Sequence, residues 1–243
     1  MSAEPLVAYR VWDAPTRLFH WINALSVLGL ILVGIVILFA GDLGIAPAGR
    51  VTLKTAHVWI GYVMTLNLLW RVVWAFLGNR YARWRAILPG GPGYATAVEA
   101  YVSAFLAGHP KQYLGHNPVG RLAVFVILLL LVIQAATGLV LAGTDIFLPP
   151  FGNWIAAWVA APNIDPATLS PTARDLMDPN TYAAMRAFRG PFAEIHELGF
   201  YLLAAIVLLH IVAVVITELR EGGTLVSAML TGQKIVQGRP EDS

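Results

Sequence analysis

Cysteine is absent from this chain of 243 residues, and charged side chains are scarce. Without cysteine the chain forms no disulfide bond, ligates no iron–sulfur cluster through thiolates and attaches no haem through thioether bonds. Asp, Glu, Lys and Arg make up only 12% of the residues, and the formal net charge of +2 is too small to indicate a nucleic-acid partner. Any redox centre in this chain must therefore be held by histidine.

Apolar residues dominate the composition instead. They make up 58% of the chain, the mean hydropathy is +0.67, and several apolar runs are about 20 residues long, which is typical of membrane proteins. We predict an all-α integral membrane protein, a four-transmembrane-helix bundle that forms a single membrane domain over residues 1–243. The predicted spans cover about residues 18–40, 55–77, 122–142 and 192–217, with a long outer loop at residues 144–190.

The distribution of Lys and Arg predicts the orientation. The N-terminal segment, the segment between the second and third spans and the C-terminal tail hold ten of these residues, whereas the other two loops hold five. The positive-inside rule therefore places both termini in the cytoplasm. An alternative is that the first apolar stretch is a cleaved signal peptide, because Ala46-Pro47-Ala48 resembles a cleavage site, but the stretch exceeds the usual length of about 7 to 15 residues.

Four of the six histidines, His20, His57, His196 and His210, lie in apolar segments, where an ionisable side chain is costly and usually functional. His196 and His210 share one segment and are separated by about 21 Å on nearly the same helix face. With the predicted topology, His57 and His196 form an outer pair and His20 and His210 an inner pair. Each pair joins two helices, as bis-imidazole ligation of a b-type haem requires. The alternative is that single histidines are hydrogen-bonded core residues or proton relays.

Arginine and glycine residues accompany the histidines. Arg71 follows His57 by 14 residues on the same face, and Arg17 precedes His20 by one turn, so both are predicted at the level of the inner pair. They are candidates to bind haem propionates; the alternative is that they extend to the cytoplasmic headgroups. Four glycines lie near the histidines or in the other two helices. They would allow a porphyrin to approach closely, or they would simply let the helices pack; they are Gly34, Gly61, Gly138 and Gly199.

Two connecting segments carry further expectations. Residues Tyr94 to Leu106 are predicted to form a short helix at the membrane interface; the alternative is a surface helix without a specific function. The outer loop at residues 144–190 is rich in proline and aromatics and too long for a mere connector. It suits a folded docking surface or a lid, and equally an interfacial aromatic belt that touches lipid.

Three segments together resemble a known family. The runs Val11–Trp21 (VWDAPTRLFHW), Gly115–Arg121 (GHNPVGR) and Leu225–Gly232 (LVSAMLTG) are similar to those of the b-type cytochrome subunit of membrane-bound nickel–iron hydrogenases. That family belongs to the bacterial cytochrome b561 group, which includes the membrane subunits of formate dehydrogenases (the formate dehydrogenase gamma superfamily). The resemblance covers nearly the whole chain, although the outer loop is longer here than in the hydrogenase cytochromes.

The resemblance implies a four-helix diheme cytochrome that takes electrons from a partner on the outer face and passes them to quinone near the inner face. Carried over to this sequence, His57 and His196 resemble the ligands of the outer haem, and His20 and His210 those of the inner haem. The implied cofactors are two haem b groups, with quinone as the electron acceptor. The implied location is the bacterial inner membrane, as a multi-pass protein surrounded by lipid.

His116 and Asn117 lie where related subunits bind quinone, at the cytoplasmic entry to the third span. Their side chains offer the hydrogen-bond donor and acceptor that quinone carbonyls and their protonation need. The alternative is that Asn117-Pro118 only caps the third helix, which is a common use of that pair.

The leading hypothesis is an electron-transfer subunit and membrane anchor without catalytic residues of its own for substrate oxidation. Its redox partner would lie on the periplasmic side and consist of hydrogenase-like subunits or a cytochrome c. One alternative is a stand-alone cytochrome b561-type oxidoreductase between superoxide, or another small reductant, and quinone, although the outer loop has no cationic excess that would form a funnel. Another is a transporter or structural anchor that uses the histidines for protons.

Overall fold

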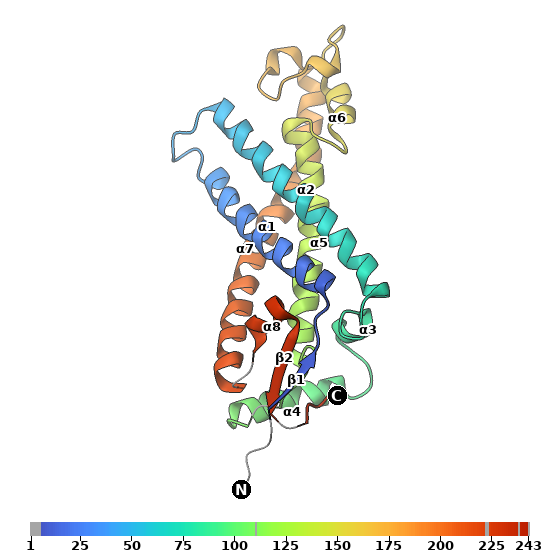
Figure 1. Cartoon of the computed structure of the whole chain (residues 1–243). Coiled ribbons are helices and arrows are strands. Elements are labelled where there is room, and N and C mark those ends of the chain that lie inside the picture. The colour runs from blue at the N-terminus through green and yellow to red at the C-terminus, as the bar shows by residue number, and fades with distance from the viewer. Residues whose placement is uncertain (1–5, 110, 222–223, 238, 243) are drawn as a thin grey trace. The chain divides into compact units, whose positions relative to one another are not determined.

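The computed structural model describes residues 6–109, 111–221, 224–237 and 239–242, and most of these residues are helical (Figure 1). In chain order the elements are β1 (Leu6–Arg10), α1 (Ala14–Leu38), α2 (Pro47–Leu77), α3 (Trp84–Ile87), α4 (Tyr94–Leu106), α5 (Pro118–Ile146), α6 (Gly152–Val159), two 3₁₀ turns (Pro166–Thr168 and Arg174–Leu176), α7 (Pro179–Glu221), α8 (Leu225–Thr231) and β2 (Gln233–Gln237).

Four of these helices, α1, α2, α5 and α7, are long and apolar enough to cross a membrane. Their most apolar windows have mean hydropathies of 2.5, 1.5, 2.8 and 2.7. Large apolar side chains such as Leu25, Leu66 and Leu208 are exposed along them, which is the arrangement expected where lipid surrounds a helix. The prediction of a mostly helical membrane protein with four candidate spans is therefore confirmed.

The helices extend beyond the predicted apolar spans. The second begins at Pro47 rather than near residue 55, and α7 begins at Pro179 rather than near residue 192. Pro47 suits the first helical position because its missing N–H would have no partner there. Pro191 lies inside α7 and removes one backbone hydrogen bond. Hydropathy thus located the apolar part of each helix, whereas the polar extensions are visible only in the structure.

The chain divides into two compact units, which are described separately. Unit 1 consists of residues 1–23, 67–129 and 203–243, and unit 2 consists of residues 24–66 and 130–202. Each of the four long helices contributes residues to both units.

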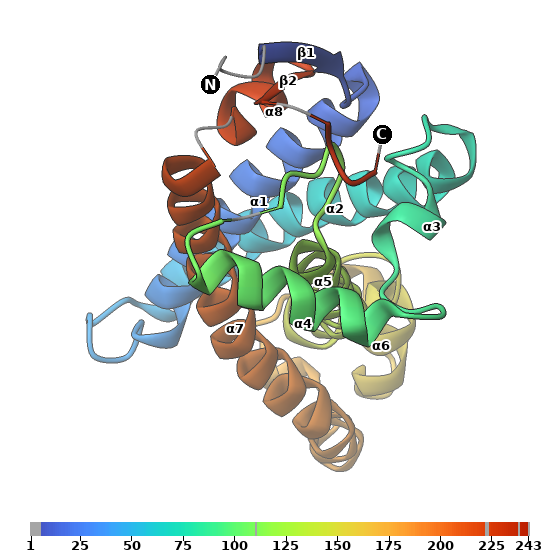
Figure 2. The same cartoon turned by 90° about the horizontal axis from the view of Figure 1, so that it is seen from below.

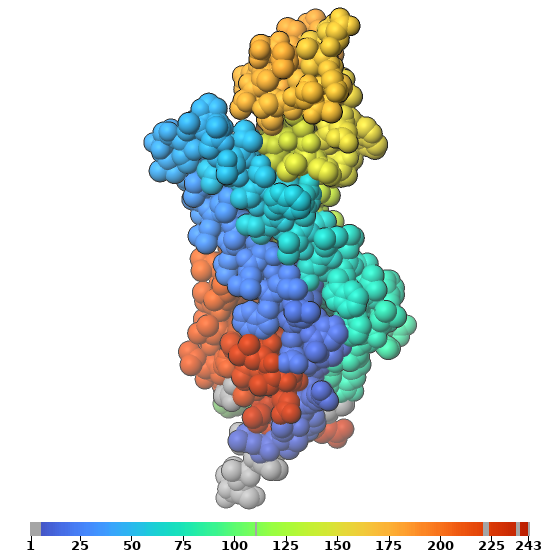
Figure 3. Space-filling view, turned by 45° about the horizontal axis from the view of Figure 1, so that its top comes forward, coloured from blue at the N-terminus to red at the C-terminus, as the bar shows by residue number. Residues whose placement is uncertain are grey.

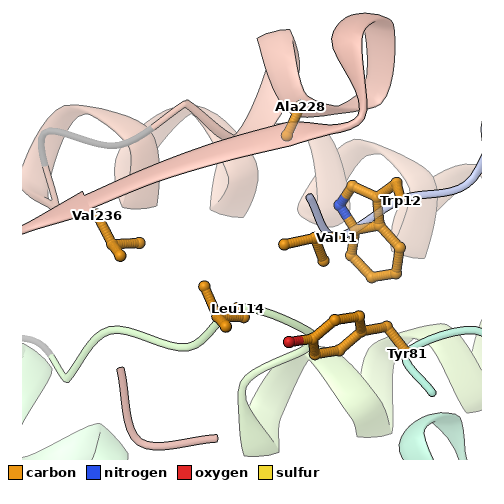
Figure 4. Packing of buried hydrophobic residues seen from close by; sticks show 6 residues of the cluster. All are labelled: Val11, Trp12, Tyr81, Leu114, Ala228 and Val236. Carbon is orange, nitrogen blue, oxygen red and sulfur yellow. The ribbon is translucent and has the colours of Figure 1, made fainter. Parts of the chain in front are cut away.

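Unit 1 contains a two-stranded antiparallel sheet that the sequence analysis did not predict. Strand β1 pairs with β2 in a register that joins Leu6 to Gln237 and Arg10 to Gln233 (Figure 2). Behind the sheet lies a small apolar core (Figure 4), formed by Val11, Trp12, Tyr81, Leu114, Ala228 and Val236. The sheet and this core hold the segments before α1 and after α8 together.

Asp13 fixes the start of α1. Its carboxylate accepts a hydrogen bond of 3.0 Å from the backbone N–H of Thr16, as an N-cap does, and others from Trp74 Nε1 at 3.2 Å and the backbone N–H of Asn79 at 3.3 Å. Partial burial works to raise the pKa of Asp13, but these hydrogen bonds outweigh it and hold the pKa below its usual value of 3.8.

Replacing Asp13 with Ala is expected to lower the free energy of unfolding by about 1 to 2 kcal/mol, because the cap is lost. Since the pKa of Asp13 is depressed in the folded chain, this stabilisation is complete above the unfolded pKa and disappears as the pH falls through the folded value. Thermal unfolding in detergent at pH 7 and at a series of pH values from about 4 down to about 2 checks both statements. Asp42→Ala, in an exposed turn, is the control. A difference between wild type and Asp13→Ala that grew toward low pH would contradict the assignment.

The loop predicted at residues 144–190 has a folded core of its own within unit 2. This core consists of Ile155, Ala156, Val159, Leu169, Met177 and Met185 from α6, the loop after it and the start of α7. An isolated β-bridge joins Ala160 to Met177. The segment is yellow to orange in Figure 3. On its surface Trp154 is 72% exposed, and an exposed aromatic side chain is compatible with contact to a protein partner or to lipid. The docking and lipid-belt interpretations of this loop therefore both remain predictions.

Segment 94–106 forms the helix α4, with the bounds that the sequence analysis gave. Tyr101 is its buried residue, and Tyr94 donates a hydrogen bond to the carbonyl of Pro118 at 2.7 Å. The helix is therefore tied to the entry of α5 by named contacts. Its interfacial role stays a prediction.

Candidate functional site

Unit 2 brings His57 of α2 and His196 of α7 together. The centres of their rings are 6.3 Å apart, and the ring planes make an angle of 71°. Imidazole nitrogens lie about 2 Å from a bound transition metal, so two rings on opposite sides of one ion have centres about 6 Å apart. The Nδ1 atom of His57 is buried and has no hydrogen-bond partner among the described residues. The spacing of this pair therefore fits two axial ligands of a single iron.

A hydroxyl group sets the protonation of His196. Thr137 Oγ1 lies 2.8 Å from His196 Nδ1 and 2.8 Å from the carbonyl oxygen of Ile133. A hydroxyl has one proton, and the carbonyl can only accept it, so Oγ1 must accept a second hydrogen bond from Nδ1–H of His196. The lone pair of the imidazole is then on Nε2, the atom that remains available to bind iron.

Glycines allow the helices to approach these two rings. A Cβ atom at Gly138 would lie 3.2 Å from Cε1 of His196, and one at Gly34 would lie 3.5 Å from Cε1 of His57. Gly199 instead faces Gln134, whose Nε2 donates a hydrogen bond to the carbonyl of His196 at 3.0 Å. A Cβ atom at Gly61 would meet nothing within 4 Å. Two of the four glycines singled out in the sequence thus contact the histidine rings.

The two histidines line a cavity of about 430 Å³ within unit 2. Apolar side chains and the two glycines form part of its wall, and charged side chains form the rest, namely Arg50, Lys54, Asp145, Arg189 and Glu197. A cavity of this size with a few convergent polar groups is typical of a cofactor site. The donor set, the glycine contacts and the cavity together fit a haem group.

Unit 1 contains the other predicted pair, His20 of α1 and His210 of α7. The two imidazoles are close enough to interact electrostatically, and Nδ1 of His20 is buried without a hydrogen-bond partner among the described residues. Each predicted pair therefore lies in one unit. Ligation of haem by these four histidines stays a prediction.

Arg17 and Arg71, the predicted propionate ligands, also belong to unit 1. Arg71 is only 5% exposed, donates one hydrogen bond of 2.9 Å to the carbonyl of Ala82, and leaves its buried Nη1 without a partner among the described residues. Arg17 donates to the carbonyl of Leu230, and its Nε atom is likewise buried without a described partner. A buried guanidinium with unused donors is suited to bind an anion.

The side chain of Asn117 is occupied as a helix cap. Its Oδ1 accepts a hydrogen bond of 2.6 Å from the backbone N–H of Gly120, and its Nδ2 donates to the hydroxyl of Tyr101 at 2.7 Å. The capping interpretation of Asn117-Pro118 therefore describes what this side chain does in the structure. A direct contact from Asn117 to quinone would compete with both bonds.

His116 differs from Asn117 because its buried Nδ1 has no hydrogen-bond partner among the described residues. Its ring packs against Trp12 with centres 5.0 Å apart, and it lines a cavity of about 410 Å³ in unit 1 together with Arg80, Tyr94 and Arg121. Burial, with the nearby charge of Arg71, lowers the pKa of His116 to about 4. His116 is therefore neutral at physiological pH and able both to donate and to accept a hydrogen bond.

Sequence reasoning missed two features of unit 2. Thr137 is an ordinary threonine in an apolar helix, and no local pattern marks it as a partner of a residue 59 positions later. Asp145 was counted only as a loop charge, yet it forms ion pairs with Lys54, Arg186 and Arg189. A carboxylate next to a predicted span, with cations at the ends of two other spans, is the signal that could have identified this cluster.

Comparison with known proteins identifies the family of the chain. The family model for prokaryotic cytochrome b561 matches residues 11–232. Proteins named "Probable Ni/Fe-hydrogenase B-type cytochrome subunit" from Rhizobium leguminosarum bv. viciae and Azotobacter vinelandii are both 28% identical, and the alignments cover 95% and 96% of this chain and 90% and 92% of theirs. A protein named "Probable Ni/Fe-hydrogenase 1 B-type cytochrome subunit" from Escherichia coli strain K12 is 26% identical over 96% of this chain and 93% of its own.

Proposed function

Because the chain belongs to the prokaryotic cytochrome b561 family, we propose that it is a diheme b-type cytochrome that carries electrons from a hydrogenase-like partner to the quinone pool. The observation that carries this proposal is the division of the four membrane histidines. His57 and His196 lie in one compact unit, and His20 and His210 lie in the other. Two pairs in two units support two haem b groups in this chain.

The partner is proposed from the comparisons. Several relatives that align over nearly their whole length bear names that assign them to Ni/Fe-hydrogenases as the b-type cytochrome subunit. A membrane subunit of this kind anchors its partner and connects it to the lipid phase. We place the chain in the bacterial inner membrane, with both termini in the cytoplasm because the N-terminal, central and C-terminal segments hold most of the Lys and Arg residues.

The chain's own residues provide ligation, orientation and shielding. A haem b held by two imidazoles supplies one-electron transfer. His57 and His196 would hold one such group, with Thr137 fixing the tautomer of His196 and the apolar part of the cavity wall packing against it. His20 and His210 would hold the other, in the unit that also contains the buried guanidinium of Arg71.

The quinone site is proposed next to His116. The neutral imidazole of His116, with its unpartnered Nδ1, is able to hydrogen-bond a quinone carbonyl and to pass on a proton. Asn117 is bonded to Tyr101 and Gly120, and so would shape this site as the cap of α5. The comparisons do not favour the alternative of a stand-alone oxidoreductase for superoxide.

The test is a pyridine haemochrome assay and a reduced-minus-oxidised absorption spectrum of the purified chain. Two b haems per chain are expected, together with reduction of both by hydrogen in membranes that contain the partner. A chain without haem, or with one haem, would contradict the diheme proposal. Two haems that hydrogen does not reduce in the presence of a co-purified hydrogenase would contradict the choice of partner.

A further inference from the structure

A charged cluster lies at one end of the cavity that contains His57 and His196. The side chain of Asp145 is 9% exposed; it accepts a hydrogen bond of 2.5 Å from Lys54 Nζ and two from Arg189, one of them 2.9 Å from Nη2. Arg186 Nη1 lies 3.9 Å from the same carboxylate. Three cations thus contact one carboxylate.

The wall of the cavity carries more positive than negative side chains. The cavity wall carries three cations and two carboxylates, which leaves an excess of positive charge after internal pairing; these residues are Arg50, Lys54, Arg189, Asp145 and Glu197. The side chain of Arg189 is only 19% exposed, so water solvates its charge poorly. Its Nε and Nη2 contact Asp145, and no described residue accepts a hydrogen bond from its Nη1, which is therefore able to bind a second anion.

The cations lie on the same helices as the histidines and at short separations. Lys54 precedes His57 by three residues, or about 4.5 Å along α2, and Arg189 precedes His196 by seven residues, or about 10 Å along α7. A group held by the two imidazoles therefore has cations within the reach of a porphyrin's acidic substituents. Asp145 contacts both cations and holds them in place beside the cavity.

We propose that Lys54 and Arg189 bind the two propionate carboxylates of the haem that His57 and His196 ligate. This inference rests on the proposed function and assigns the anion site of unit 2, whereas the sequence analysis placed propionate candidates only in unit 1. Charge-assisted hydrogen bonds from an ammonium and a guanidinium are well suited to carboxylates in a partly buried site. Asp145 is a positioning residue in this arrangement.

The test compares two porphyrins in the full-length chain. The apoprotein, in a His210→Ala background that leaves the site of unit 2 intact, is titrated with haem and with the dimethyl ester of iron protoporphyrin, which lacks the two charges. The chain with Lys54 and Arg189 is expected to bind haem at least tenfold more tightly than the ester. Lys54→Gln and Arg189→Gln should each reduce that preference by about tenfold, the effect of one charge-assisted hydrogen bond.

Arg186→Gln is the matched control, because Arg186 lies on the same helix and faces the same carboxylate but does not line the cavity, and its side chain is 50% exposed. Its preference for haem over the ester should stay within about twofold of the parent chain. Equal weakening of both porphyrins by Arg189→Gln would show a purely structural role and overturn the proposal. If His57→Ala in the same background still binds haem with an unchanged spectrum, the proposed ligation itself fails.

Discussion

Replacing His57 with Ala is expected to remove one of two b haems from the purified chain, and replacing His210 with Ala is expected to remove the other. His57 lies in unit 2 and His210 in unit 1, so each substitution would delete one of the two histidines that we propose as ligands of one iron. After the loss of one axial ligand, a single imidazole and the proposed contacts to the propionates remain, and we expect these to hold the haem too weakly to survive purification in detergent. Pyridine haemochrome quantification of each variant measures the number of haems per chain. The double variant, with both histidines replaced, is expected to contain no haem.

His109→Ala is the control for these substitutions. His109 is an exposed histidine after α4, outside the four long helices, and its loss should leave two haems. The spectra add a second check, since the haem that survives in His57→Ala should be the one that is missing in His210→Ala. Loss of the same haem in both variants would contradict the separation into two sites.

Replacing Gly138 with Val is expected to empty the site in unit 2 while His57 and His196 are both retained. A Cβ atom at position 138 would already lie 3.2 Å from the His196 ring, and the two further methyl groups of valine need room that the ring occupies. The ring must then move away from Thr137, and its hydrogen bond is lost. Haem affinity at this site should fall by roughly 10- to 100-fold.

Gly61→Val is the matched control, because it lies on the helix of His57 and a Cβ atom there meets nothing within 4 Å. It should retain both haems after detergent purification. Haem loss in Gly61→Val with full retention in Gly138→Val would reverse the assignment of the two glycines. Circular dichroism of both variants separates loss of haem from loss of fold.

The number and place of the membrane spans could be predicted because they depend on one quantity, the apolar character of about 20 consecutive residues. The same measure could not find the starts of α2 and α7, because residues 47–54 and 179–190 include charged and polar side chains such as Arg50 and Arg189 and are therefore not part of an apolar run. The ion pairs of Asp145 join both of these extensions to the end of α5.

The sheet shows another limit of sequence reasoning. Strands β1 and β2 have five residues each and lie more than 220 positions apart, so neither carries a signal that points to the other. For the sites, depth along a helix was enough to assign histidines to pairs, and each predicted pair lies in one unit. Depth alone could not reveal Thr137, which bonds the His196 ring, or Asp145, which pairs with Lys54 and Arg189, because these contacts depend on side-chain geometry that only the folded chain defines.

The hydrogen bond between Thr137 and His196 limits proton transfer in unit 2. The hydroxyl accepts from Nδ1–H and donates to the carbonyl of Ile133, so the sequence of hydrogen bonds stops at a backbone oxygen. A proton wire needs a titratable group at each end, and this one has a titratable group only at His196. If His196 ligates a haem as we propose, electron transfer through that haem would proceed without proton transfer along this route. Any coupled proton uptake would then need other groups, such as the neutral imidazole of His116.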